Sequence, residues 1–224
     1  MDIDERSLWL DRDFNETYGG FKTKVDSTET LTSLPYHDNV RRDMLTLLCR
    51  SIQERRVVGA IAELGVYHGH TARLFHHYMP ERLLYLLDTF NGFPSQDIAL
   101  EKSKTGFETG SQHFADTSVK LAMKTIQPLN ENIRIIKGNF PESATPELKD
   151  ESFALVHLDA DLYGPTKEGL EFFYPRLSSG AMMIVHDYNA WLGARQAVEE
   201  FTKSHRIVPI PMPDKSGSCL LVKP

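Results

Sequence analysis

The sequence predicts an α/β fold in which helices cover both faces of a doubly wound, mostly parallel sheet. Short apolar segments that suit buried strands alternate with segments whose apolar residues recur at helical spacing. The first strand leads into a glycine turn at Gly65 and Gly69, and the second ends in Asp88. An acid roughly 20 residues past a glycine turn is typical of an α/β site for a ligand with a nucleoside part.

The composition is that of one soluble globular domain. The chain has 224 residues, of which 41% are hydrophobic and 25% are charged. Its net charge of −6 and pI near 5.8 argue against a nucleic-acid partner, because such partners require a basic surface. Cys49 and Cys219 form no C-x-x-C pair, so we expect buried free thiols in a reducing compartment and no zinc knuckle.

No targeting or membrane segment is expected. The first residues, M-D-I-D-E-R, are acidic where a signal peptide would be basic and then apolar. No apolar run approaches the roughly 18 residues that cross a bilayer. We therefore predict a cytoplasmic protein with no membrane partner.

The first elements follow from the apolar pattern. Residues 1–35 are mixed in character and are predicted to form an N-terminal arm over the fold or over a partner subunit. The domain is predicted to span 36–224. Its first elements in order are a helix at 38–54, a strand from Val57 into Glu63, a helix at 71–78 that Pro80 ends, and a strand at 83–88.

A long polar segment, 91–117, comes next and contains N-G-F-P, K-T-G and E-T-G. Loops of this length are uncommon inside a compact domain unless they cover a binding site. We therefore predict a lid, with a passive insertion as the alternative.

The remaining elements complete the alternation of strands and helices. They are a helix at 118–126, a strand at 133–137, a strand at 153–159, a helix at 166–174, a strand at 181–185, a helix at 193–203, and a hairpin of 206–210 with 218–222. Such alternation implies right-handed crossovers. In an open sheet of this kind the ligand lies beyond the carboxyl ends of the strands, where polar or glycine residues follow strand after strand here.

Six strings in this chain, taken in order, resemble one known family. They are A-E-L-G-V-Y-H-G-H-T-A, L-D-T-F-N-G-F-P, H-F-A-D-T-S-V, I-I-K-G-N-F-P-E-S, H-L-D-A-D-L-Y-G-P-T and H-D-Y-N-A-W-L-G-A-R-Q-A-V. Together they resemble the macrocin O-methyltransferase (TylF) family from about Leu31 to the C-terminus. That resemblance implies a Rossmann-like class I methyltransferase fold whose seven-stranded sheet has an antiparallel last strand. It also implies the cofactor S-adenosylmethionine, a small natural-product or sugar-containing acceptor, methylation of a hydroxyl, and a homo-oligomer.

The resemblance also implies which residues bind the cofactor. Glu63, Gly65 and Gly69 would lie against the methionyl part, and Asp88, followed by Thr89, would bind the ribose hydroxyls. An ionised Asp88 could accept hydrogen bonds from both vicinal hydroxyls. The residues expected to border the adenine are Gly138, Asn139 and Phe140.

Asp159 and Asp161 follow the strand at 153–159. Turn or helix-capping roles would explain them without chemistry, since aspartate favours both positions. By resemblance, Asp159 would instead border the cofactor and bind a divalent metal such as Mg²⁺, and Asp161 would be the general base. Methyl transfer is an in-line displacement, so a base that removes the hydroxyl proton in an aligned complex supplies much of the rate.

The chain departs from the family pattern at His186, because metal-binding members carry two consecutive aspartates before the tyrosine of this strand. Mg²⁺ favours oxygen ligands, whereas imidazole suits zinc, iron, nickel or copper. Three interpretations stay open: a weaker Mg²⁺ site at Asp159 and Asp187, a transition-metal site, or no metal with His186 or His157 in proton transfer. For His157, a satisfied core histidine is the alternative.

The glycine turn departs as well. The family string G-x-W-R-G-G-S is replaced by G-V-Y-H-G-H-T, which puts any ligand role of His68 or His70 in doubt. His76 and His77 have no partner at metal-ligand spacing, and we predict that both are surface residues.

Two other functions share part of this pattern. An NAD(P)-dependent oxidoreductase would also need a glycine turn and an acid on the second strand, but this turn lacks G-x-G-x-x-G. A non-catalytic module that binds a nucleoside cofactor would need neither the pair Asp159 and Asp161 nor a lid.

Overall fold

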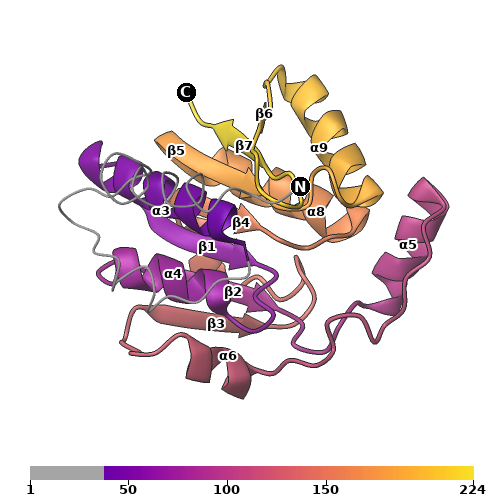
Figure 1. Ribbon diagram of the computed structural model, residues 1–224, viewed down its shortest axis with the longest axis horizontal. Helices are drawn as coiled ribbons and strands as arrows, with labels where there is room; N and C mark the ends of the chain where they lie inside the picture. Colours follow the sequence, from indigo (N-terminus) through magenta and orange to yellow (C-terminus); the bar gives the residue numbers. More distant parts are fainter. Residues whose placement is uncertain (1–37) are drawn as a thin grey trace, which may run out of the picture.

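The computed structural model describes residues 38–224, except for the side chain of Asn39. The predicted N-terminal arm, 1–35, lies outside the described residues. Seven strands form one sheet in the order β3-β2-β1-β4-β5-β7-β6 (Figure 1). The strands are β1 (Ala60–Leu64), β2 (Leu84–Asp88), β3 (Ile133–Lys137), β4 (Phe153–Leu158), β5 (Leu177–Val185), β6 (Ile210–Pro211) and β7 (Cys219–Val222).

The sheet confirms the predicted topology. Strands β1 to β5 pair in parallel, and β7 runs antiparallel to β5. Strand order reverses between the β1–β2–β3 half and the β4–β5 half, so the crevice beside β1 and β4 is the topological switch point. Side chains of β1 and β4 are buried on both faces, which explains why these strands show little alternation.

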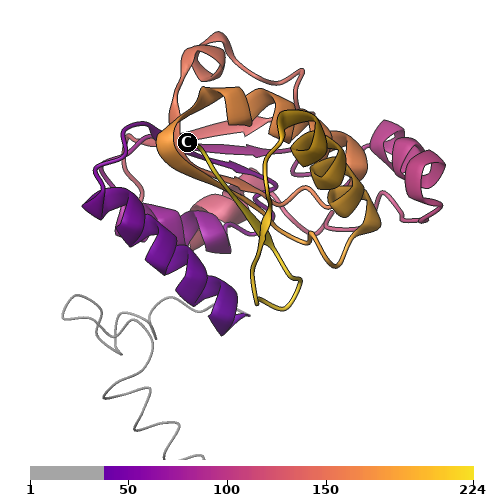
Figure 2. The same ribbon diagram turned by 90° about the horizontal axis from the view of Figure 1, so that it is seen from above.

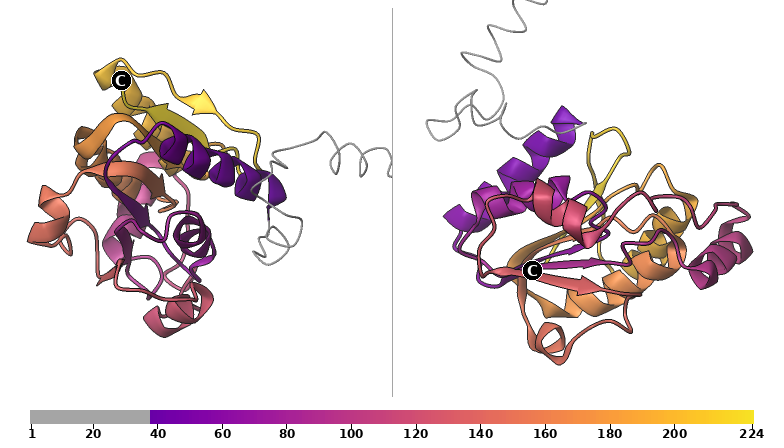
Figure 3. Two further views of the ribbon diagram at one scale, coloured as in Figure 1. Left: turned by 90° about the vertical axis from the view of Figure 1, so that its left-hand side faces the viewer. Right: turned by 90° about the horizontal axis from the view of Figure 1, so that it is seen from below.

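Helices cover both faces of the sheet (Figures 2 and 3). They are α3 (Asn39–Glu54), α4 (His70–Tyr78), α5 (Ser95–Thr105), α6 (Val119–Thr125), α7 (Pro146–Asp150), α8 (Tyr163–Phe173) with the 3₁₀ turn Tyr174–Arg176, and α9 (Leu192–His205). Helices α3, α4 and α6 lie on one face, and α8 and α9 lie on the other. None of the helices in the described part of the chain is both long and apolar enough to cross a membrane.

Helix α3 shows how local sequence places an element near the site. Asp38 caps it by accepting hydrogen bonds from the backbone N–H groups of Val40 and Arg41 at 2.9 and 3.2 Å. Its other carboxylate oxygen accepts from the backbone N–H of Lys215 at 2.7 Å. Asp38 therefore joins the start of α3 to the loop between β6 and β7.

Strand β1 begins at Ala60, three residues later than predicted. The backbone N–H of Val57 donates to the carbonyl of Ile52 and so completes the end of α3. Val58 is 71% exposed. These apolar residues therefore belong to the helix terminus and the turn that follows it, not to the sheet.

The segment 91–117 contains helix α5, which the sequence analysis did not predict. The apolar residues of α5 do not follow a strong helical period, so only tertiary contacts mark it. Its one buried side chain is Glu101, which accepts a 2.7 Å hydrogen bond from the backbone N–H of Tyr163. Nothing in the structure tests whether the segment opens and closes, so the lid stays a prediction.

Candidate functional site

A cavity of about 400 Å³ opens at the carboxyl ends of β1, β2, β4 and β5. This volume lies within the range of small-molecule sites. Four non-glycine residues on its wall adopt left-handed backbone conformations: Tyr67 (φ 50°), Phe114 (φ 55°), Asp161 (φ 58°) and Asp187 (φ 57°). Each such residue costs of order 1–3 kcal/mol, and such residues concentrate at functional sites.

Gly65 brings two strand ends together. A Cβ at this position would lie 1.9 Å from the carbonyl oxygen of Asp159, and the backbone φ is +88°. The sequence analysis assigned the glycine to close approach by a ligand. The structure adds a different requirement, because the turn after β1 packs directly against the turn after β4.

Asp88 organises the glycine turn. One of its carboxylate oxygens accepts from the backbone N–H groups of Val66 and Tyr67 at 2.7 and 2.8 Å, and the other accepts from Phe90 at 2.6 Å. A carboxylate offers about four lone-pair positions, so about one remains for a ligand. The predicted role of Asp88 in binding the ribose hydroxyls stays a prediction.

Glu63 lines the cavity and pairs with His157, whose Nδ1 lies 3.2 Å from Oε1 of Glu63. Burial, and then the neighbouring Asp159 carboxylate, raise the pKa of Glu63 well above its usual range. Burial lowers the pKa of His157 to about 3, so this imidazole is neutral at pH 7. Oε2 of Glu63 has no hydrogen-bond partner among the described residues. An ammonium group entering the cavity would satisfy it.

All of the predicted cofactor-binding residues except Gly69 line the cavity. Thr89, Gly138, Asn139 and Phe140 line the cavity, as do Glu63, Gly65, Asp88 and Asp159. Gly69 is not among the lining residues. A Cβ there would meet the side chain of Ile126 at 3.1 Å, so Gly69 packs α4 against the end of α6.

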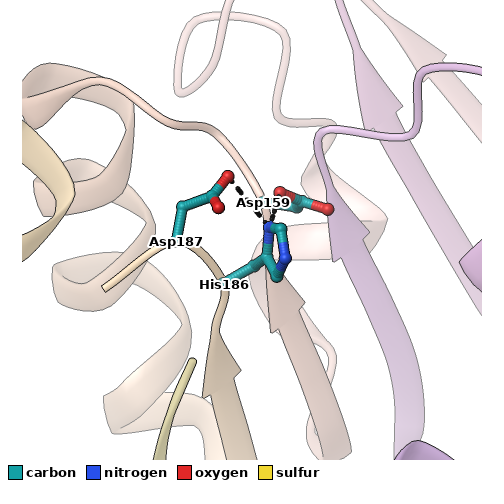
Figure 4. Close-up of side chains that lie close together, drawn as sticks. All are labelled: Asp159, His186 and Asp187. Carbon is teal, nitrogen blue, oxygen red and sulfur yellow. Dashed lines mark hydrogen bonds and ion pairs between the residues drawn. The ribbon is translucent and has the colours of Figure 1, made fainter. Parts of the chain in front are cut away.

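His186 lies between two carboxylates at the ends of β4 and β5 (Figure 4). Its Nδ1 is 2.7 Å from Oδ1 of Asp159 and 3.0 Å from Oδ2 of Asp187. Burial by itself would lower the pKa of His186, but these two carboxylates raise it to about 9. The opposite effect holds for Asp159, where the charges of His186 and Arg41 outweigh burial and hold the pKa well below its usual range.

Arg41 reaches the same cluster from α3. Its Nη1 contacts Nε2 of His186, and its Nη2 lies 3.3 Å from Oγ1 of Thr71 and 3.5 Å from Oδ2 of Asp159. The positive charge of Arg41 lowers the pKa of His186, but this effect is smaller than that of the two carboxylates.

Asp161 is buried and lines the cavity. Burial, then the Asp159 charge and a hydrogen bond with Asp187, raise the pKa of Asp161 well above its usual range. Burial would raise the pKa of Asp187, but the hydrogen bond and charge of His186, with a smaller effect of the bond to Asp161, hold it below its usual range. A cation placed beside Asp161 would lower its pKa and favour the carboxylate form.

The donor set at this cluster fits a divalent metal ion. One ligand atom from each of Asp159, His186 and Asp187 lies within 4.8 Å of the other two. An imidazole with two carboxylates suits Mn²⁺, Fe²⁺ or Zn²⁺ better than Mg²⁺, which prefers oxygen alone.

Several lining residues were missed by the sequence analysis. They include Asp38, Arg41, Tyr67, Phe93, Asp97, Phe114 and Lys215. Phe93 and Phe114 come from the predicted lid, and Phe93 also packs against Trp191 with ring centroids 5.9 Å apart. For Phe93 and Phe114, the length of the segment 91–117 was the only signal in the sequence.

The histidines fall into distinct environments. His76 is buried and bonds the carbonyl of Pro128 at 2.9 Å, so its predicted surface position is wrong, whereas His77 is exposed as predicted. His68 and His70 line the cavity, but His157 does not. His157 is instead a core residue beneath Glu63, which removes the geometric basis for its role in proton transfer.

Comparisons with known proteins agree with this architecture. The model of the macrocin O-methyltransferase (TylF) family matches residues 36–219. Demethyldecarbamoylnovobiocin O-methyltransferase of Streptomyces niveus is 27% identical over 154 residues, which are 65% of this chain and 58% of that protein. Mycinamicin III 3''-O-methyltransferase of Micromonospora griseorubida is 28% identical over 162 residues, which are 67% of this chain and 63% of that protein.

The chain therefore spans about three fifths of the length of these two relatives. Among solved structures, that of the O-methyltransferase NovP superposes with a TM-score of 0.69 at 22% identity, covering 82% of this chain and 79% of that one. At this identity the likeness shows a shared fold.

Proposed function

The chain belongs to the macrocin O-methyltransferase family, and on that premise we propose that it is an S-adenosylmethionine-dependent O-methyltransferase. Its acceptor is the hydroxyl of a small natural product or of a sugar attached to one. The two named relatives are O-methyltransferases of demethyldecarbamoylnovobiocin and of mycinamicin III, and they support this acceptor class. The reaction transfers the methyl carbon from sulfur to the acceptor oxygen, and the oxygen loses its proton.

One observation carries the proposal: acids from four strand ends face a single cavity. Each acid lies at or near the carboxyl end of one strand: Glu63 of β1, Asp88 of β2, Asp159 of β4 and Asp187 of β5. Asp161 lies beside them. S-adenosylmethionine brings a sulfonium and an ammonium group, and this acidic surface would favour both charges. The unpartnered Oε2 of Glu63 supports the same assignment, because an ammonium would satisfy it.

Asp161 is the residue that we assign to the acceptor proton. It faces the cavity from the end of β4 and lies within hydrogen-bond reach of Asp187. A cationic donor bound nearby would favour the carboxylate form of Asp161, which would then accept the hydroxyl hydrogen. The fixed ends of β4 and β5 hold the base in place, so alignment requires little reorganisation.

A divalent metal is part of the proposal. Asp159, His186 and Asp187 would hold it, and a metal bound there would act as a Lewis acid that makes the acceptor hydroxyl easier to deprotonate.

Two measurements test the function. Isothermal titration calorimetry should show binding of S-adenosylmethionine and no binding of NAD, which an oxidoreductase would bind instead. A screen of glycosylated and phenolic acceptors, with mass spectrometry of the products, should detect the gain of one methyl group. Binding of NAD alone, or cofactor binding without methylation of any hydroxyl in the panel, would contradict the proposal.

A further inference from the structure

The cavity carries a set of aromatic rings beside its acids. Tyr67, Phe93 and Phe114 all line it, and all three side chains are partly buried. The ring centroids of Tyr67 and Phe114 lie 5.2 Å apart, and those of Phe93 and Phe114 lie 5.6 Å apart, both edge to face. These three rings form one continuous patch, the aromatic surface. Small-molecule sites combine such apolar walls with a few polar groups, which here are the carboxylates at the strand ends.

The two ends of the segment 91–117 pack together, and this brings Phe93 beside Phe114. A Cβ at Gly92 would lie 2.2 Å from the backbone oxygen of Ser111, and the φ of Gly92 is +73°. Only a residue without a side chain allows so close an approach at this backbone conformation. The two phenylalanines therefore form part of one unit, although 20 residues separate them in the sequence.

Trp191 joins this unit to the acids from outside the cavity. It does not line the cavity, but its ring centroid lies 5.9 Å from that of Phe93, edge to face. Its backbone N–H donates to the carbonyl of Asp187 at 2.9 Å. Asp187 is in turn hydrogen-bonded to Asp161, the proposed base. Trp191 therefore holds Phe93 in a fixed position relative to the end of β5.

We infer that the acceptor hydroxyl is carried by a ring whose flat, apolar face packs on Phe93 and Phe114, and that Trp191 is a positioning residue for this packing. The inference rests on the proposed methyltransferase function and narrows its acceptor class. An aromatic face carries partial negative charge, so it attracts the edges and C–H groups of a flat ring. Burial of that ring also removes apolar area from water. A polyol without a ring would gain neither contribution.

Ligand-detected NMR titrations of the full chain, with and without saturating S-adenosylhomocysteine, test the aromatic surface. The probes are phenol, methyl α-L-rhamnopyranoside and glycerol, which present an aromatic ring, a sugar ring with an apolar face, and hydroxyls without a ring. We expect at least one ring probe to bind and glycerol not to bind. Phenol binding would support an aromatic acceptor, and rhamnoside binding would support a sugar ring. Binding of neither ring probe, or of glycerol as tightly as a ring probe, would overturn the inference.

Phe93→Leu and Phe107→Leu are the matched variants. Both phenylalanines pack edge to face on Trp191, at 5.9 and 5.3 Å, but Phe107 is 42% exposed and does not line the cavity. Phe93→Leu should weaken binding of the ring probe by about fivefold, because a flat face is lost, whereas Phe107→Leu should match the unchanged chain. Equal probe affinity in the two variants would overturn the inference.

Trp191→Leu and Trp191→Phe test the positioning role. Trp191→Leu should weaken binding of the ring probe by about fivefold, because Phe93 loses its aromatic support, and Trp191→Phe should restore most of the affinity. No rescue by Trp191→Phe, or no loss in Trp191→Leu, would overturn the role of Trp191. Failure of S-adenosylhomocysteine to bind would contradict the proposed function instead, and the titrations without it would still decide whether the aromatic surface binds a ring.

Discussion

The carboxylate of Glu101, on α5, accepts a 2.7 Å hydrogen bond from the backbone N–H of Tyr163, the first residue of α8. Glu101 is fully buried, and the same carboxylate lies against Gly193 in the first turn of α9. One acidic side chain thus joins the predicted lid to the N-termini of two helices, where negative charge is favoured. The lid segment is anchored at this point.

Gly193→Ala should weaken that anchor. A Cβ at Gly193 would lie 2.0 Å from a carboxylate oxygen of Glu101, which must then shift off the amide of Tyr163. We expect the free energy of unfolding in urea to fall by about 1–3 kcal/mol. Gly110→Ala is the control, because nothing lies within 4 Å of a Cβ there. Equal stability of the two variants would show that Glu101 has no anchoring role.

Asp88→Asn tests the link between the glycine turn and the cofactor. An amide offers one acceptor oxygen where the carboxylate offers two, so at least one of the N–H groups of Val66, Tyr67 and Phe90 loses its partner. Stability should fall by about 1–3 kcal/mol, and calorimetry should show much weaker binding of S-adenosylmethionine. Asp116→Asn is the control, since Asp116 contacts the hydroxyl of Tyr67 from a side chain that is 72% exposed. If Asp88→Asn bound the cofactor as tightly as the unchanged chain, the glycine turn would have no role in cofactor binding.

Asp161→Asn should separate catalysis from binding. The amide keeps the size of the side chain and tolerates its left-handed backbone, but it cannot take a proton. The methylation rate should fall by about 10²- to 10⁴-fold, as is usual when a general base is lost. Calorimetry should show that S-adenosylmethionine still binds. A rate close to that of an Asp150→Asn control, at an exposed position on α7, would mean that another group takes the proton.

Asp97→Asn should change how stability depends on pH. Burial, and then the charge of Glu142, raise the pKa of Asp97 from 3.8 to about 6. Between these values the folded chain binds more protons than the unfolded chain, so stability falls as pH rises and the full cost applies above about pH 6. Because the group is partly solvated, that cost is at most about 1 kcal/mol.

The difference between Asp97→Asn and the unchanged chain should therefore favour the variant at pH 7.5 and shrink at pH 5. Thermal unfolding at the two pH values measures it. Asp150→Asn, which removes an exposed acid, should show no such change. A variant less stable than the unchanged chain at pH 7.5 would indicate that the Asp97 charge is stabilising.

Local patterns in the sequence determined the order of the elements, the parallel sheet and the carboxyl ends where the site lies. Apolar periodicity predicts buried faces, and strand ends of a parallel sheet meet at one edge, so Asp88, Asp159 and His186 could be placed without coordinates. Helix α5 escaped prediction because its one buried residue is an acid, Glu101, so no apolar stripe marks the helix in the sequence.

Only the tertiary structure decided which residues of the site contact one another. Arg41 and His186 are 145 positions apart. No local sequence pattern predicts that α3 packs on the sheet so that these two side chains come into contact. The tight packing of Gly65 against Asp159 is likewise a contact between two turns. Sequence periodicity reports which face of an element is buried, whereas partners across the cavity depend on how whole elements pack against one another.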